Sequence, residues 1–338
     1  MRLPEFTYLE PADLDEALEM LAEHGADCRV LAGGTDLLVR MKQRLLTPAC
    51  LMSLKSVDGL AGIHEADGAL EIGAATPLAD ITASEPVRRN FPALAEAVEA
   101  VGAVSIQHFR GTIGGNLCQD NRCRFYNQSA FFRSTKQLCH KAGGQICYAR
   151  EGSDRCRSTC QSDTAPALIA LGAEVTVCSR DGRRSMPLME LYTATGEHPL
   201  SLADHELLTQ VRIPLPQPGE GAAYRRLAYR SAIEYPVVCA GAWVRVEKRK
   251  VADARIVVGA IASGPLHITG AAEHLVGRRA EDRAALEKTA NSAADAAAAF
   301  AVDNVHGSTE YRMKMAAVMT ARALQEALDR AAERGSNG

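Results

Sequence analysis

Two glycine-rich segments and one cysteine-rich segment carry the residue types best suited to ligand chemistry. The sequence LAGGTDLL occupies residues 31–38, and GTIGGN occupies residues 111–116. Glycine permits positive φ and close backbone approach to a ligand, and successive N–H groups in such a turn form an anion-binding concavity. A pyrophosphate needs several donors, so two such turns facing one another would suit it. The residues concerned are Gly33, Gly34, Thr35, Asp36, Thr112, Gly114 and Gly115.

Each glycine pair also has a simpler interpretation, because Gly-Gly after a strand is typical of an ordinary turn. Neither segment matches the dinucleotide fingerprint or the P-loop. Taken alone, the glycines leave both interpretations open.

The third segment is a long polar stretch with six of the ten cysteines, spaced C-x4-C-x15-C-x7-C-x8-C-x3-C over residues 118–160. Arg, Lys, Gln, Asn, Ser and Gly dominate it, so burial alone should not keep it ordered. Metal binding would supply the missing stabilisation. Zinc favours closely paired ligands, which only Cys156 and Cys160 approach, whereas an iron–sulfur cluster tolerates irregular loops. The alternative is a flexible loop with free thiols.

The surrounding elements alternate between helical and strand patterns, which indicates an α/β or α+β fold rather than an all-β fold. An i, i+3, i+4, i+7 apolar stripe predicts a helix over residues 11–24, and a second helix is expected over 86–101. Further predicted elements are a strand in 28–34, a strand in 50–55, a strand and helix start in 69–81, a helix and strand in 164–179, and a strand in 206–216.

The C-terminal third has its own pattern. Residues 217–222, QPGEGA, are the best candidate linker, and strands 236–247 and 251–262 are expected to pair as a hairpin with its turn at EKRK. The last 70 or so residues are alanine-rich and predicted to be largely helical. The apolar face of the final helix would comprise Met315, Val318, Met319 and Leu324.

Composition limits the function classes. The chain has 338 residues, 47% hydrophobic residues and a net charge of −3, so it offers two or three domains and no basic field for nucleic acid. No apolar run approaches the roughly 20 residues of a membrane span, and the N-terminus lacks the apolar core of a signal peptide. We therefore expect a cytoplasmic protein without nucleic-acid or membrane partners.

Four motifs in order, LAGGTDLL, RGTIGGNLC, SDTAPALIALGAEV and EYRMKMAAVMTARAL, resemble the FAD-binding subunit of the molybdenum hydroxylase (xanthine dehydrogenase) family over nearly the whole chain. The resemblance implies an α+β fold with a two-part FAD-binding domain at 1–216, whose parts meet near residue 57. It also implies a C-terminal flavoprotein domain of strands followed by helices at 222–330.

One departure from the family pattern is informative. In most relatives GGNLC runs almost directly into the SPxxDxxPALLALGA pattern, whereas here about forty residues intervene. An insertion at 119–161 resembles the β subunit of 4-hydroxybenzoyl-CoA reductase, which carries a [4Fe–4S] cluster there. The resemblance implies Cys123, Cys139, Cys147 and Cys156 as ligands, with Cys118 and Cys160 as structural thiols and a swap of Cys156 for Cys160 left open.

The family pattern also implies the flavin-binding residues. Asp163 would lie near the ribityl chain or phosphates, with helix N-capping as its structural alternative; Arg225 would lie near the ring, with a surface charge as its alternative. The implied FAD-binding residues are Val30, Leu31, Ala32, Gly33, Gly34, Thr35, Asp36, Gly102, Thr112, Gly114, Gly115, Asn116, Asp163, Leu208 and Arg225.

By this resemblance the chain is an electron-transfer subunit of 4-hydroxybenzoyl-CoA reductase. Electrons from a low-potential donor such as ferredoxin would pass through [4Fe–4S] and FAD to partner subunits holding [2Fe–2S] clusters and a molybdenum cofactor, in a dimer of heterotrimers. The alternatives are the FAD subunit of a hydroxylating dehydrogenase with a zinc-binding or metal-free insertion, and a non-redox, zinc-stabilised interaction module.

Overall fold

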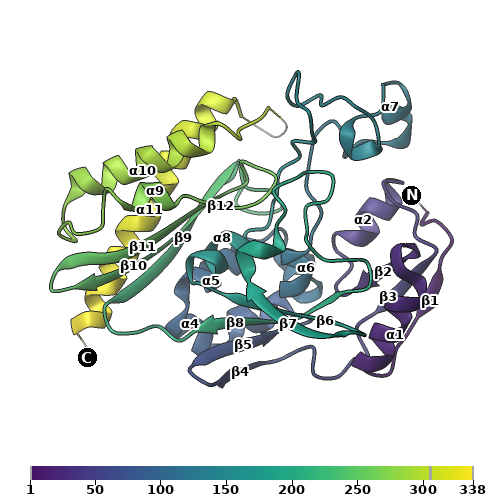
Figure 1. The fold of residues 1–338 in the computed structure, drawn as a ribbon, viewed down its shortest axis with the longest axis horizontal. Coiled ribbons are helices and arrows are strands. Elements are labelled where there is room, and N and C mark those ends of the chain that lie inside the picture. The colour runs from purple at the N-terminus through teal and green to yellow at the C-terminus, as the bar shows by residue number, and fades with distance from the viewer. Residues whose placement is uncertain (1, 304–306, 337–338) are drawn as a thin grey trace.

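The computed structural model describes residues 2–303 and 307–336, and it contains three sheets (Figure 1). The first sheet is small and parallel, with strand order β1-β3-β2, and it includes the apolar run that precedes the first glycine turn. Cys28 of β2 lies opposite Cys50 of β3 in the register. The elements of this part are β1 (Thr7–Leu9), α1 (Leu14–His24), β2 (Cys28–Leu31), α2 (Leu37–Lys42) and β3 (Cys50–Ser53).

The expected first helix is confirmed as α1. Asp13 caps its N-terminus by accepting a hydrogen bond from the Glu16 N–H, and Ala17, Leu18 and Leu21 are the buried stripe. This stripe packs on β2 and β3, in a core that also includes Leu54 and Leu207. The small sheet is thereby fixed against the second part of the molecule.

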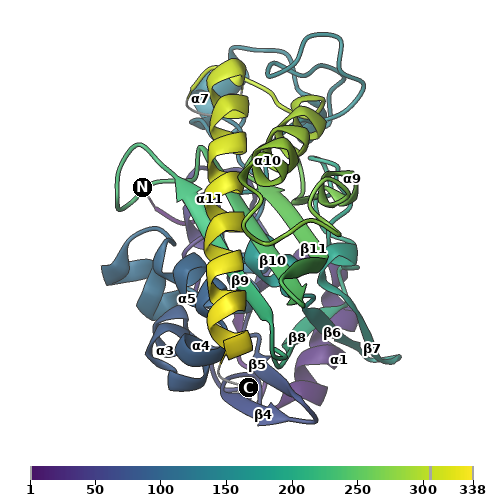
Figure 2. The same cartoon turned by 90° about the vertical axis from the view of Figure 1, so that its left-hand side faces the viewer.

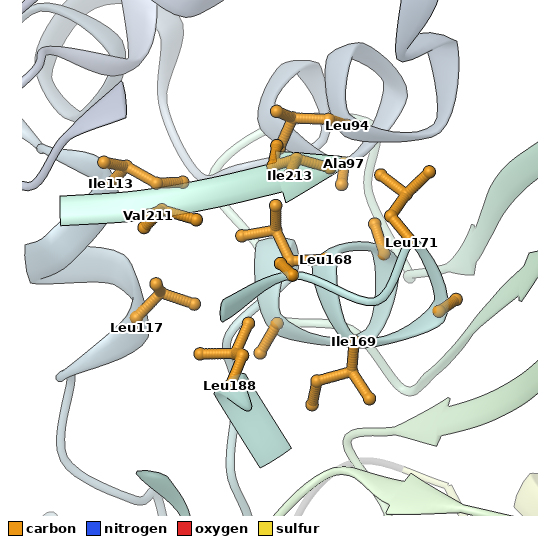
Figure 3. Packing of buried hydrophobic residues seen from close by; sticks show 14 of the residues in the cluster. Leu94, Ala97, Ile113, Leu117, Leu168, Ile169, Leu171, Leu188, Val211 and Ile213 are labelled. Atoms are coloured by element: carbon orange, nitrogen blue, oxygen red, sulfur yellow. The ribbon is translucent and has the colours of Figure 1, made fainter. Parts of the chain in front are cut away.

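The second sheet has five strands in the order β4-β5-β8-β6-β7, and every neighbouring pair is antiparallel. Helices α5 and α8 cover it, and Leu94, Leu168 and Ile213 meet in the largest core (Figure 3). Its elements are β4 (Ile63–Ala66), β5 (Ala69–Gly73), α3 (Leu78–Ala83), α4 (Glu85–Asn90), α5 (Pro92–Glu99), α6 (Ile113–Leu117), α8 (Thr164–Ala170), β6 (Glu174–Ser179), β7 (Gly182–Pro187) and β8 (Leu207–Pro214).

The single helix expected over 86–101 is instead two helices. Phe91 separates α4 from α5 with φ −129° and ψ 55°. The cause is Pro92, because a proline has no N–H for the preceding turn and excludes the residue before it from the α region. The C-terminal limit near Gly102 is otherwise as predicted.

The third sheet is antiparallel, in the order β12-β11-β10-β9, with the long helices α10 and α11 across one face (Figure 2). The expected hairpin is confirmed: β10 pairs with β11, and Lys248 and Arg249 turn between them with positive φ. The expected linker is shorter than predicted, because β9 already begins at Glu220. The elements are β9 (Glu220–Leu227), β10 (Val238–Glu247), β11 (Lys250–Gly259), β12 (Leu266–His267), α9 (Thr269–Ala272), α10 (Arg283–Ala298) and α11 (Thr309–Ser336).

Helix α8 joins the second and third sheets. A Cβ at Gly241 or Gly259 would come within 2.4–2.6 Å of atoms of Pro166, so the backbone of the third sheet lies directly against this helix. On the opposite face Met319 and Leu324 of α11 are buried, and Met315 and Val318 pack beside them, as the periodicity predicted. The third sheet is thus covered on both faces.

Residues 119–161 form a largely irregular excursion that projects at the top of Figure 1 and contains only α7 (Ala130–Ser134) and one 3-10 turn (His140–Ala142). Its two ends are joined, because Arg122 and Thr159 exchange backbone hydrogen bonds of 2.8 and 2.9 Å. Polar side chains fix it to the body of the protein. The Lys141 ammonium donates to Asp120 and to the Gly196 carbonyl, and the Arg133 guanidinium donates to the Gln43 and Arg44 carbonyls.

Composition suggested metal binding as the only source of order in this excursion. The polar anchors add a second source of order that composition did not reveal.

No helix within 2–303 or 307–336 combines the length and apolarity of a membrane span.

Candidate functional site

A cavity of about 710 Å³ opens between the small parallel sheet and the second part of the molecule, and both glycine turns line it. Cavities of this size accommodate organic cofactors. Thirteen of the fifteen residues expected to bind FAD lie on its wall. They are Val30, Ala32, Gly33, Gly34, Thr35, Asp36, Gly102, Thr112, Gly114, Gly115, Asn116, Asp163 and Leu208.

The two glycine turns meet backbone to backbone. A Cβ on Gly33 would lie 1.7 Å from the Arg110 carbonyl oxygen, next to the second turn. A Cβ on Gly114 would lie 2.8 Å from the Ala74 carbonyl oxygen, where β5 ends. Gly34 has φ +73°, in the region that favours glycine. The glycines therefore create the approach that brings two separate segments to one cavity.

The two turns differ in the donors they offer. In the part of the chain that the structure describes, no acceptor is found for the backbone N–H groups of Gly34, Thr35 and Asp36. Most backbone N–H groups of the second turn already donate hydrogen bonds within the protein. Ile113 N–H donates to the Thr76 carbonyl, and Gly114 N–H donates to the Ala74 carbonyl. Thr112 Oγ1 accepts from Gly115 N–H, which leaves its own O–H as a donor. Free backbone donors for an anion thus come mainly from the first turn.

Asn116 connects the second turn to the SDTAP segment. Its Oδ1 accepts from the hydroxyl groups of Ser162 and Thr164, both at 2.7 Å, and all three residues are buried. This contact fixes the position of Asp163, which follows Ser162 and lines the cavity.

The Asp163 carboxylate is 4% exposed and lies between two side chains of β9. It accepts from the Tyr224 hydroxyl at 2.6 Å and from the Arg226 guanidinium at 3.2 Å. Burial raises the pKa of Asp163 to about 6, although the charge of Arg226 and both hydrogen bonds act to lower it. The N-capping alternative is wrong for the side chain, because Asp163 precedes α8 but makes no capping hydrogen bond.

Arg225 does not line the cavity, contrary to its expected place near the flavin ring. Its guanidinium pairs with Glu96 at 2.7 Å and with Glu326 at 2.9 Å. Side chains alternate between the faces of a strand, so Tyr224 and Arg226 point to Asp163 while Arg225 points to the other face. The surface-charge alternative is also incomplete, because Arg225 belongs to an ion-pair cluster. Leu31 is likewise absent from the cavity wall.

Sequence reasoning missed a chain of charges that joins this cavity to the cysteine-rich excursion. Arg122 donates to the Asp36 carboxylate, and Arg40 pairs with Asp120 at 2.9 Å. The buried Lys141 ammonium pairs with Asp120 at 2.8 Å. The available signal was the position of Asp120 and Arg122 directly after GGNLC. Segments 197–207 and 230–235 also supply wall residues and carried no motif.

Three of the four predicted cluster ligands, Cys123, Cys147 and Cys156, lie near one another in the excursion. Burial raises the pKa of the Cys123 thiol to about 11, and the neighbouring Cys156 and Cys147 act in the same direction through their charge. Cys147 packs beside Cys123 in a small apolar cluster. Cys160, by contrast, is buried in the main core with Leu168, and Cys118 lines the cavity.

These cysteines are not arranged around a single ion. Across residues 2–303 and 307–336, no three or more His, Cys, Asp or Glu side chains converge in the way a metal site requires. The proximity of Cys123, Cys147 and Cys156 is compatible with a larger group, because each thiolate of an iron–sulfur cube binds a different iron.

Comparison with known proteins gives one consistent result. Residues 4–216 match the family described as the FAD binding domain in molybdopterin dehydrogenase, and residues 222–327 match the CO dehydrogenase flavoprotein C-terminal domain. The carbon monoxide dehydrogenase medium chain of Afipia carboxidovorans is 31% identical, over 96% of this chain and 98% of its own length. The 6-hydroxypseudooxynicotine dehydrogenase complex subunit alpha of Paenarthrobacter nicotinovorans is 28% identical, over 98% and 97%.

Solved structures agree. A carbon monoxide dehydrogenase chain from Hydrogenophaga pseudoflava superposes with a TM-score of 0.79 at 25% identity, covering 98% of this chain and 99% of that one. A chain of quinoline 2-oxidoreductase from Pseudomonas putida 86 gives 0.76 at 25% identity, covering 98% and 99%.

The cavity itself fits FAD. The first turn has free N–H donors for a diphosphate, and the volume suits a dinucleotide-sized cofactor. The chain therefore belongs to the FAD-binding medium subunits of the molybdenum hydroxylase family and has the two-domain fold of the carbon monoxide dehydrogenase medium chain.

Proposed function

We propose that this chain is the electron-transferring FAD subunit of a larger complex, with a molybdenum cofactor in a large subunit and [2Fe–2S] clusters in a small one, arranged as a dimer of heterotrimers. The proposal is supported by end-to-end similarity to proteins named medium chain. The observation that carries it is the convergence of both glycine turns on one cavity.

The roles of the chain's own residues follow from the cavity. The N–H groups of Gly34, Thr35 and Asp36 and the Thr112 hydroxyl would hold the diphosphate, while Asp163 holds a fixed charge on the wall. Bound FAD supplies the ability to exchange electrons in pairs or singly. In this proposal the chain makes no substrate bonds, and its task is to hold and shield the carrier. We also expect it to work in the cytoplasm.

The finer proposal concerns the excursion at 119–161. We infer that Cys123, Cys139, Cys147 and Cys156 ligate a [4Fe–4S] cluster. Support comes from the placement of Cys123 beside Cys147 and Cys156. Further support comes from the cationic side chains of Lys141 and Arg122, where the excursion meets the body of the protein. Lys141 and Arg122 reach the cavity-lining carboxylates Asp120 and Asp36, so the excursion is physically connected to the flavin site.

A cluster there would make the excursion an entry port for electrons from a low-potential donor such as ferredoxin. The corresponding reaction is the reductive dehydroxylation of 4-hydroxybenzoyl-CoA to benzoyl-CoA in the partner subunit. This assignment rests on the excursion alone, since the curated relatives are named for carbon monoxide, caffeine and nicotine derivatives. The electron donor is proposed on the same ground.

The test is the iron, sulfide and flavin content of the purified complex, with its visible and EPR spectra. Cys123→Ser, Cys139→Ser, Cys147→Ser and Cys156→Ser should each lose cluster iron and the cluster EPR signal while FAD remains. Cys160→Ser is the matched control, because its sulfur lies in the main core. Unchanged iron content in the four variants would contradict the cluster proposal and leave the FAD proposal standing.

A second candidate is the FAD subunit of a hydroxylating dehydrogenase, with a zinc-binding or metal-free excursion. The names of the curated relatives favour it, since most are dehydrogenases. Zinc in place of iron and sulfide, together with reduction of FAD by the substrate of the complex, would select this candidate. The non-redox interaction module has no support once the family membership is established.

A further inference from the structure

A second cavity of about 490 Å³ lies between the five-stranded sheet and the C-terminal domain, and it shares no wall residue with the flavin cavity. Its wall combines apolar residues with four arginines. In Figures 1 and 2 the C-terminal end of α11 comes down beside α4 at this place. The arginines are Arg89, Arg255, Arg330 and Arg334, and the acidic wall residues are Glu220 and Glu333.

Arg255 is the unexplained group in this cleft. Its guanidinium lies 3.9 Å from the centre of the Trp243 ring, and a Cβ on Gly172 would touch it at 2.3 Å. Within the described residues its Nε is buried and has no hydrogen-bond partner, and no carboxylate forms an ion pair with it. The Trp243 ring and the charges of Asp253 and Glu220 offset only part of the desolvation of this guanidinium. Desolvation accordingly lowers the pKa of Arg255.

Arg334 reinforces the positive charge. Its hydrogen bonds in the described chain go to neutral acceptors, the backbone carbonyls of Glu220, Arg89 and Asn90 at 3.3–3.5 Å, although the Glu220 charge also acts on it. The cleft thus presents one guanidinium without a hydrogen-bond or ion-pair partner among the described residues and a second that donates hydrogen bonds only to carbonyl groups. Arg330, by contrast, is already paired with Glu96 at 2.6 Å and Glu326 at 2.9 Å.

The side chains of the cavity wall indicate which chemical class of ligand the cleft can bind. Guanidinium groups with free N–H edges match the oxygens of a phosphate group, often with two parallel hydrogen bonds. Phe91, Pro92, Leu171 and Leu215 supply an apolar side to the same cavity. A small organic phosphate would use both features, whereas a free inorganic anion would use only the arginines.

We propose that this interdomain cleft binds the phosphate group of a small molecule, with Arg255 and Arg334 as its ligands. The site is independent of FAD and of the cysteine excursion. A ligand there would touch both the five-stranded sheet and the C-terminal domain, since Pro214 and Trp243 both line the cavity. It would therefore stabilise the contact between them.

The experiment is calorimetric titration of the flavin-loaded complex with inorganic phosphate and with phenyl phosphate, at constant ionic strength. Occupied flavin sites keep the glycine turns from binding the probes. Binding of phenyl phosphate more tightly than phosphate identifies an organic ligand, and equal binding identifies the free anion. Arg255→Gln should weaken binding at least about tenfold, the loss expected for a charged hydrogen-bonding group.

Two variants make the result decisive. Arg249→Gln removes the same charge from the exposed β10–β11 turn and should bind normally. Arg255→Gln loses the cation–π contact with Trp243, so its thermal unfolding is measured without ligand, and a transition as cooperative as that of the wild type shows that its binding loss is not a folding defect. Absence of binding at millimolar probe, or equal binding by Arg255→Gln, overturns the proposal.

Discussion

At the scale of single residues, Gly33 is the position where a side chain has no room. Gly33→Ala should clash with the Arg110 carbonyl and separate the two glycine turns, at a cost of about 1–3 kcal/mol in unfolding free energy. The purified variant should retain less flavin, as measured by absorbance, and melt at a lower temperature. Gly270→Ala, where a Cβ meets nothing within 4 Å, is the control. Full flavin retention by Gly33→Ala would show that the contact is not needed.

Asp163 predicts a particular pH dependence. Its pKa is raised to about 6 in the folded state, so the folded protein binds its proton more tightly than the unfolded chain. The stability from this group is therefore complete below about pH 4 and is lost as the pH rises through about 6.

Asp163→Asn removes this dependence. Relative to wild type, the variant should gain roughly 3 kcal/mol in unfolding free energy between pH 4 and pH 7, the linkage value of about two pKa units. Denaturant unfolding of both proteins at the two pH values measures the difference. A difference that does not change with pH would mean that Asp163 is ionised normally.

The residue scale also shows the limit of sequence reasoning. The glycine motifs and the family pattern predicted thirteen residues of the cavity wall, but most of the wall residues were not among those predicted. Arg225 and Arg226 are adjacent arginines in one strand, and only the register of β9 decides that Arg226 faces Asp163. That register depends on pairing with β10, which no local pattern specifies.

At the scale of elements, α11 is anchored by Arg312, whose side chain is fully buried. It donates to the carbonyls of Val237, Val302 and Ala260, and thereby ties the helix to the ends of β10 and β11. Arg312→Leu leaves these carbonyls without partners and should cost at least about 3 kcal/mol. Thermal unfolding measures it, with Arg322→Leu on the exposed face of the same helix as control.

Lys141 anchors the excursion to the body of the protein, as Arg312 anchors α11. Lys141→Met removes the contacts with Asp120 and the Gly196 carbonyl and should free residues 119–161 from the body of the protein. Limited proteolysis should then cleave within the excursion faster than in wild type, with the remaining fragments intact. Lys136→Met removes a cation that lies over the Phe132 and Tyr148 rings, outside this anchor, and should leave cleavage unchanged.

Most elements were predictable from local pattern, and the failures have physical causes. The break at Phe91 could have been predicted from Pro92, because proline ends the preceding helix one residue earlier. The strand β9 was mistaken in part for a linker, because its Gly and Ala residues make room for α11 rather than for a turn. The order of the excursion was unpredictable, since its anchors are long-range polar contacts.

At the scale of the whole molecule, the Glu96 carboxylate joins the two domains, in addition to Asp163. Glu96 of α5 accepts from the Tyr224 N–H and Arg225 in β9 and from Arg330 in α11. Burial alone would raise its pKa, but these hydrogen bonds lower it. The interactions of the Glu96 carboxylate therefore stabilise the fold at neutral pH. This stabilisation is lost in acid, as the pH falls through the lowered pKa of Glu96.

Glu96→Gln should loosen the contact between the domains, with a loss of about 1–3 kcal/mol at pH 7 that shrinks in acid. Scanning calorimetry is the measurement, and a separate early transition is the expected sign of weakened coupling. Glu99→Gln, exposed on the same helix, is the control. A single unshifted transition at pH 7 would show that the apolar packing of α8 suffices.

The mutual hydrogen bonds of Arg122 and Thr159 have a consequence for protein engineering. The segments around Arg122 and Thr159 already run side by side. The residues between them could therefore be removed and the two ends joined by a tight turn. The same geometry makes the excised piece a candidate cassette for related flavin subunits, provided that the host offers acceptors for Arg133 and Lys141 at the corresponding junction.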